Sequence, residues 1–234
     1  MLYNILVSFI AGVGGNTLGA LISLFVKKEY NFVGRALGVA SGVMLAVVFF
    51  DLLPDAIHSA DGLILPMLGM CIGGILMCVS ARLTDSNASR VEQGFGSIGV
   101  RIMIGIAIHN FPEGLAIGGG ISIGHSLATA ILIGLHNIPE GLAVALPYRL
   151  DKGQWYRGLF ASALAGIPTI VGAIIGSLVS TTNYAMSLFL ALAGGAMLYI
   201  VIEDMLPISS KTQKYTSFTV LLGVLIGAIV IYVV

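Results

Sequence analysis

Eight stretches of about 20 mostly apolar residues run through this chain of 234 residues and leave room for little else. Charged residues make up only 9% of the chain and apolar residues 57%, which is too little polar surface for a globular domain of this length. A helix that crosses a bilayer satisfies its own backbone hydrogen bonds. We therefore predict an all-α membrane protein with eight transmembrane helices. The predicted helices cover residues 4–26, 35–54, 62–81, 101–123, 126–148, 158–179, 185–207 and 216–234.

The whole chain is predicted to form one transmembrane domain, residues 1–234, of a multi-pass protein in the cell membrane. The first stretch has neither a basic n-region nor a clear small-residue cleavage site, so we expect it to stay as a helix and not to be removed as a signal peptide. Cys71 and Cys78 lie within one predicted helix. Their spacing does not suit a disulfide, and we expect both to pack as small apolar side chains.

The basic residues indicate how the chain is oriented in the membrane. All eleven lie in or beside alternate connections between the predicted helices. They are Lys27, Lys28, Arg35, Arg82, Arg90, Arg101, Arg149, Lys152, Arg157, Lys211 and Lys214. Because short loops rich in Lys and Arg stay in the cytoplasm, we predict that both termini are extracytoplasmic. Once these loops are assigned, no basic patch is left for nucleic acid.

Two near-copies of one polar sequence interrupt the apolar stretches. They read His109-Asn110-Phe111-Pro112-Glu113-Gly114 and His136-Asn137-Ile138-Pro139-Glu140-Gly141. In each copy the histidine and the glutamate are four residues apart, so both project from one face of a helix. The predicted orientation makes the two helices antiparallel, and the copies meet near mid-membrane. An ionisable side chain there costs about 2.5–3.5 kcal/mol, a cost that a bound cation would offset. We call the four ionisable residues the quartet: His109, Glu113, His136 and Glu140.

Two imidazoles and two carboxylates form a mixed set of nitrogen and oxygen ligands. Such a set suits Zn²⁺, with Fe²⁺, Mn²⁺ and Co²⁺ as close alternatives, whereas Mg²⁺ and Ca²⁺ favour oxygen ligands alone. Asn110 and Asn137 directly follow the two histidines and point about 100° away from them. We interpret these amides either as hydrogen-bond donors that support the site or as ligands of an adjacent ion.

A second, weaker repeat joins the ends of two other helices. Residues 42–55 align with residues 195–208, which matches Asp51 with Asp204. These helices also run in opposite directions. We therefore predict inverted pseudo-symmetry that relates helix 2 to helix 7 and helix 4 to helix 5, an arrangement that serves alternating access in transporters.

Asp51 is expected near the outer mouth of this arrangement and Asp204 near the inner mouth. Each aspartate either guides ions or simply caps a helix end beside the proline that follows it. Glu203, next to Asp204, is either a relay for protons or metal at the inner side or the partner of a loop lysine.

The segments HNFPEGLAIG, HNIPEGLAVALP, DLLPDAI and EDMLP resemble those of the Zrt-/Irt-like (ZIP) divalent-metal transporters, in their compact prokaryotic form. The resemblance covers essentially the whole chain, and the paired motifs of the fourth and fifth helices are highly specific to the family. It implies uptake of zinc toward the cytoplasm, often with iron, manganese or cadmium (Cd²⁺) as further substrates. It also implies transport without ATP. We predict that the protein has no organic cofactor.

The resemblance assigns roles to particular residues. The quartet resembles the primary metal site of the family, and Asn110 and Asn137 resemble contributors to a second ion that the glutamates bridge. Members with two ions often have an aspartate where Asn137 stands, and a glutamate before the proline of the sixth helix, where this chain has Ile167. Two negative charges are therefore missing, and we predict one tightly bound metal instead of two.

Two other classes of protein fit parts of this pattern. An intramembrane metalloenzyme would keep an open position on a bound zinc, but the chain has no His-Glu-x-x-His sequence and no obvious general base, so we predict that it is not an enzyme. A metal sensor would normally need a soluble output domain. The partners that the sequence predicts are a divalent metal ion and the lipid bilayer, and the glycine-rich helix faces permit a homodimer.

Overall fold

The computed structural model describes residues 2–27, 29–84, 95–121, 126–150, 154–178 and 182–233. Within these ranges every regular element is a helix, which confirms the predicted all-α class. Three segments, labelled η, have the wider turn of a π-helix and continue directly into α-helices on both sides.

The first three predicted spans consist of seven helical elements, of the α or the π type. They are α1 (Leu2–Ser8), η1 (Phe9–Gly14), α2 (Gly15–Ser23), α3 (Tyr30–Val47), η2 (Val48–Leu52), α4 (Leu53–Ala60) and α5 (Ile64–Thr84). The last five predicted spans consist of eight elements. They are α6 (Phe95–Ile121), α7 (Ser126–Leu150), α8 (Trp155–Ala165), α9 (Ile167–Leu178), α10 (Asn183–Ile200), η3 (Val201–Met205), α11 (Leu206–Thr212) and α12 (Thr216–Val233).

Seven helical rods in the described part of the chain are long and apolar enough to cross a membrane. α7 is a further rod of 25 residues, so it is about 37 Å long and exceeds the roughly 30 Å of bilayer hydrocarbon. Within the described residues, each of the eight predicted stretches overlaps one helical rod. The second and seventh rods, Tyr30–Ala60 and Asn183–Thr212, extend further than predicted. The chain is thus a multi-pass membrane protein, while the orientation of its termini stays a prediction.

The second sequence repeat folds into the same irregular structure twice. η2 and η3 each hold five residues and end two residues before a proline, Pro54 or Pro207. A proline within a helix lacks the N–H group and clashes with the carbonyl four residues earlier, and we attribute the wider π-helical turn to this clash. Asp51 lies inside η2 and Asp204 inside η3. Neither aspartate caps a helix end, so the capping interpretation is wrong.

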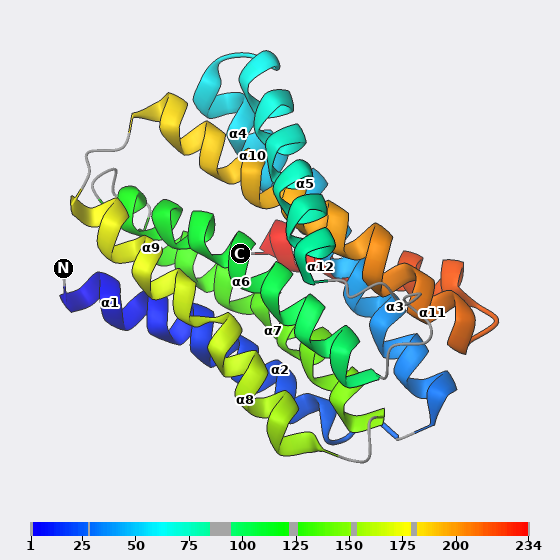
Figure 1. Cartoon of the computed structure of the whole chain (residues 1–234). Helices are drawn as coiled ribbons and strands as arrows, with labels where there is room; N and C mark the ends of the chain where they lie inside the picture. The colour runs from blue at the N-terminus through cyan, green and yellow to red at the C-terminus, as the bar shows by residue number, and fades with distance from the viewer. Residues whose placement is uncertain are drawn as a thin grey trace.

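The helices form two groups that meet along α6 and α7 (Figure 1). In one group, α2 and α8 pack on α7, and α9 packs on α6; in the other, α12 packs on α3, and α5 packs on α10. α10 also contacts α6, and α3 contacts α7. Buried apolar side chains such as Met44, Ile106 and Met197 belong to the core cluster shared by both groups. The central pair of helices is therefore shielded on both sides by other helices.

Matching glycine contacts show how far the inverted repeat extends. A Cβ atom on Gly19 of α2 would run into the backbone carbonyl of Ile138, and one on Gly172 of α9 would run into that of Phe111. Ile138 and Phe111 occupy the same place in the two polar sequence copies. The first rod, Leu2–Ser23, therefore packs on α7 as α9 packs on α6. The repeat thus also relates the first rod to the sixth rod, Trp155–Leu178. The sequence did not reveal this pairing.

Candidate metal centre

The structure brings all four quartet residues together at the contact between α6 and α7. His109 and Glu113 come from α6, His136 and Glu140 come from α7, and none of them is more than 2% exposed. One ligand atom each of His109, Glu113 and Glu140 lie within 4.8 Å of one another. The spacing of four residues in each copy places the ligands on one helix face, and the antiparallel pairing turns the two faces toward each other.

The quartet is linked across the helix pair by short polar contacts. Nε2 of His109 lies 3.0 Å from Oε1 of Glu140, and Nε2 of His136 lies 3.0 Å from Oε1 of Glu113. The same Glu113 oxygen is 3.9 Å from Nε2 of His109. Glu113 therefore contacts both histidines, and His136 joins the cluster through this carboxylate.

Each quartet residue also has a second polar atom that is buried and has no hydrogen-bond partner among the described residues. These atoms are Nδ1 of both histidines and Oε2 of both glutamates. Buried polar atoms usually have a partner. The quartet thus has more ligand capacity than its internal contacts use, as expected of groups that bind a cation.

Asn110 and Asn137 tie the central helices to their outer neighbours. Nδ2 of Asn110 donates a hydrogen bond to the carbonyl oxygen of Ala165 at 2.8 Å, and Nδ2 of Asn137 donates one to the carbonyl oxygen of Ala11 at 3.0 Å. Both acceptors lie where a helix is irregular, at the end of α8 and within η1. Each amide oxygen is buried without a partner within the described ranges. The amide nitrogens fix the helices, while the amide oxygens remain able to bind an ion or water.

Comparison with known proteins identifies the family. The sequence profile described as ZIP zinc transporter matches residues 81–234, which is more than half of the chain. The chain belongs to the ZIP zinc transporter family. This ZIP chain is 30% identical to zinc transporter ZupT of Salmonella heidelberg, over 95% of its own length and 93% of the relative. It is 28% identical to zinc transporter ZupT of Corynebacterium aurimucosum, over 88% and 86% of the two chains. The family predicted from the sequence motifs is confirmed.

The two repeat-related aspartates of this ZIP chain have different surroundings. Asp51 is close enough to His136 and Glu113 to interact with both electrostatically. Asp204 instead forms an ion pair with Arg101, with Nη2 and Oδ1 3.7 Å apart. Sequence reasoning assigned Arg101 only to a cytoplasmic loop and missed this contact. Its position eight residues before His109 on a continuous helix was the available signal. Glu203 is half-buried beside Asp204 in η3.

Asn16 of the ZIP chain is a buried polar residue without an assigned partner. It lies in α2, where a Cβ atom on Gly141 of α7 would meet its backbone. Its side chain is fully buried, and both amide atoms lack a hydrogen-bond partner in the part of the chain that the structure describes. These contacts assign no role to Asn16.

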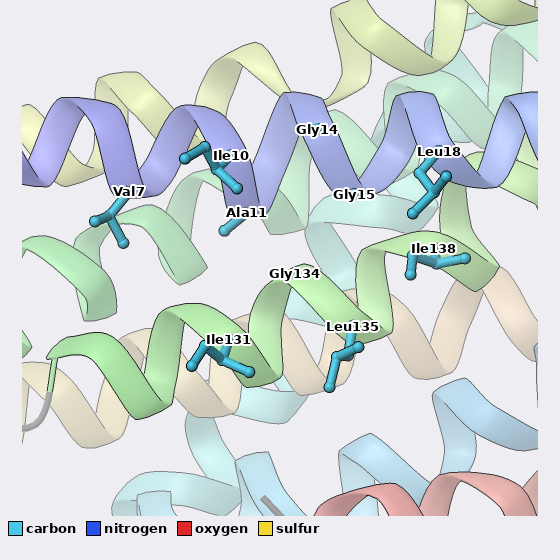
Figure 2. A pocket seen from close by; sticks show the side chains of 10 residues that line it. All are labelled: Val7, Ile10, Ala11, Gly14, Gly15, Leu18, Ile131, Gly134, Leu135 and Ile138. Carbon is cyan, nitrogen blue, oxygen red and sulfur yellow. The ribbon is translucent and has the colours of Figure 1, made fainter.

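A groove runs between the first rod and α7 of the ZIP chain, and Figure 2 shows its lining. The ten lining residues are apolar side chains and glycines: Val7, Ile10, Ala11, Gly14, Gly15, Leu18, Ile131, Gly134, Leu135 and Ile138. Several of them, including Ile10 and Leu18, are exposed. Among the described residues, neither a quartet residue nor another ligand side chain for a cation lines the groove, so the candidate metal centre is the buried quartet and not this groove.

Proposed function

We propose that this ZIP protein carries zinc across the membrane toward the cytoplasm through the quartet on α6 and α7. The proposal depends chiefly on one observation: ligand atoms of His109, Glu113 and Glu140 converge to within 4.8 Å in the buried centre of the bundle. The relatives compared above are named zinc transporters. Buried ionisable groups in a membrane usually mark an ion path.

The ligand set supports zinc as the principal substrate. Zinc accepts imidazole nitrogen and carboxylate oxygen at about 2.0–2.2 Å, commonly with four ligands. His109, Glu113 and Glu140 supply three, and His136 becomes the fourth if its ring turns from Glu113 toward the ion. Fe²⁺, Mn²⁺ and Co²⁺ accept the same donor atoms, and Cd²⁺ is a further candidate substrate. In this scheme the metal is cargo and no catalytic step is needed.

Uptake by purified protein in liposomes tests the proposal. Zinc outside the vesicles is expected to accumulate inside without ATP, as reported by a trapped zinc-sensitive dye, and parallel experiments with the other four metals give the order of preference. A folded, reconstituted protein that neither accumulates nor releases any of the five metals would contradict the proposal.

We also propose that Asp51 receives the cation on its way to the quartet. Asp51 lies in the π-helical segment η2, and its electrostatic interaction with His136 and Glu113 supports this role. Glu203 and Asp204 occupy the corresponding place in η3 and are proposed to receive the cation on the inner side.

One zinc ion per chain is the expected stoichiometry. The position that would supply a further carboxylate to a second ion is Ile167, which is 44% exposed and therefore does not line the buried site. Asn137 supplies a neutral amide, and its nitrogen is already bonded to Ala11. Equilibrium dialysis of the purified protein with metal analysis measures the ratio. Two zinc ions bound with similar affinity would contradict this stoichiometry.

A further inference from the structure

The inner member of the matched aspartate pair is neutralised by a fixed positive charge. Arg101 and Asp204 form an ion pair in which the two side chains are 7% and 8% exposed. Among the described residues, no lysine or arginine forms an ion pair with Asp51 in η2. A carboxylate that can attract a cation therefore adjoins the quartet on one side, and a carboxylate already paired with a cation lies on the other.

Arg101 lies in line with the quartet along α6. Arg101, Gly105 and His109 are spaced by four residues, so they follow one another along one side of the helix. Arg101 is about 12 Å from His109 along the axis, toward the end of α6 that the basic loops place at the cytoplasmic side. A Cβ atom on Gly105 would meet Met77 and Ile200, both buried. A cation leaving the quartet along this side of α6 passes that apolar contact and then the Arg101–Asp204 ion pair.

The arginine breaks the symmetry of the repeat. Extending the alignment of the two polar sequence copies toward their N-termini matches Arg101 of α6 with Ala128 of α7. The repeat thus supplies an aspartate in both η2 and η3, but it supplies an arginine on one side only. A perfectly symmetric protein would treat the two directions alike, whereas this one has a charge that distinguishes the inner end.

We propose that Arg101 is a tethered cation that occupies Asp204 and closes the inward route until the transported metal displaces it. The proposal rests on the proposed function and on the predicted orientation. In a medium of low dielectric constant, charge interactions scale with the product of the charges. A divalent ion attracts Asp204 and repels the guanidinium twice as strongly as a monovalent ion at the same distance, so divalent ions are favoured at this step.

Thiol accessibility at Ile200 tests the closure without relying on transport. The protein for this test carries Cys71→Ala, Cys78→Ala and Ile200→Cys. The new thiol lies at the apolar contact of Gly105, Met77 and Ile200, between the quartet and the Arg101–Asp204 ion pair. Vesicles with the cytoplasmic face outward are treated with a membrane-impermeant thiol reagent. Arg101→Gln is expected to raise the rate of modification at least tenfold, whereas Arg101→Lys leaves the rate near that of the parent. Arg149→Gln, which alters another buried arginine, is the control and is expected to have no effect.

Removing Arg101 alone takes this ion pair away from the buried Asp204 carboxylate, and breaking a buried ion pair on one side can unfold the protein. The double variant Arg101→Gln/Asp204→Asn removes both charges and is expected to fold and to show the same faster modification. A folded variant without the ion pair whose Ile200→Cys thiol reacts at the parent rate would overturn the proposal. Zinc titration of the same proteins is expected to give one ion each. If the quartet does not bind zinc, the titration shows no bound ion. If the ion pair does not close the route, the rate of thiol modification stays the same when the pair is removed.

Discussion

Liposomes that carry the Glu113→Gln variant are expected to accumulate zinc no faster than liposomes without protein. Glu113 is the quartet residue that contacts both histidines, with its Oε1 atom 3.0 Å from His136 and 3.9 Å from His109. The amide keeps the shape of the side chain but loses the negative charge that a dication requires. Loss of a supporting group beside a metal typically costs 10–100-fold, so loss of a proposed ligand is expected to lower the initial rate by at least about 100-fold.

The matched control is Glu29→Gln, which makes the same chemical change at an exposed carboxylate before α3. That variant is expected to transport zinc at the parent rate. Elution of both variants as single folded species in detergent separates a transport defect from misfolding. Substantial zinc uptake by folded Glu113→Gln would show that the quartet is not the path.

The second large effect is expected from Gly19→Ala. This substitution adds only one methyl group, but it is expected to lower the stability of the protein strongly. The added Cβ atom would run into the carbonyl oxygen and carbon of Ile138, which belong to the backbone of α7 and cannot turn aside. α2 and α7 must separate, which strains the Asn137 hydrogen bond to Ala11 beside the quartet. Overpacking of about 3 kcal/mol corresponds to a melting temperature lower by roughly 6–12 °C for a chain of this size.

Gly14→Ala, in the same rod, is the control. The nearest atom to its added Cβ is the carbonyl oxygen of Phe9 at 3.8 Å, an ordinary contact. Alanine is also the better helix former by about 1 kcal/mol, so the melting temperature is expected to stay the same or rise. Thermal unfolding in one detergent compares the two variants, and equal losses of stability in both would contradict the close packing of α2 on α7.

The sequence predicted the meeting of the quartet residues on α6 and α7 better than the contacts of these helices with their outer neighbours. Helical periodicity alone places His109 and Glu113 on one face, and the charge pattern of the loops makes α6 and α7 antiparallel, so their meeting follows from local geometry. The long apolar stretches fixed the helix number because a bilayer demands about 20 residues per crossing. These features depend on residues that are close together in the sequence, so they can be predicted from one sequence alone.

Features that depend on distant contacts could not be predicted in this way. Asn137 bonds to Ala11 and Asn110 to Ala165, residues far away in sequence whose carbonyls carry no signal of their own. The sequence alone left a helix cap open as one interpretation of Asp51 and Asp204, because a proline is typical both of helix ends and of π-helical turns. Orientation, the quartet's role as metal ligands and a homodimer stay predictions.

X-ray absorption spectroscopy of the zinc-loaded protein tests most directly whether the quartet binds the metal. Zinc held by the quartet is expected to have nitrogen and oxygen neighbours at about 2.0–2.2 Å, with the scattering of two imidazole rings. His109→Ala is expected to remove one ring from the spectrum. A sulfur neighbour at about 2.3 Å, from Cys71 or Cys78, or an imidazole signal unchanged in His109→Ala, would contradict zinc binding by the quartet.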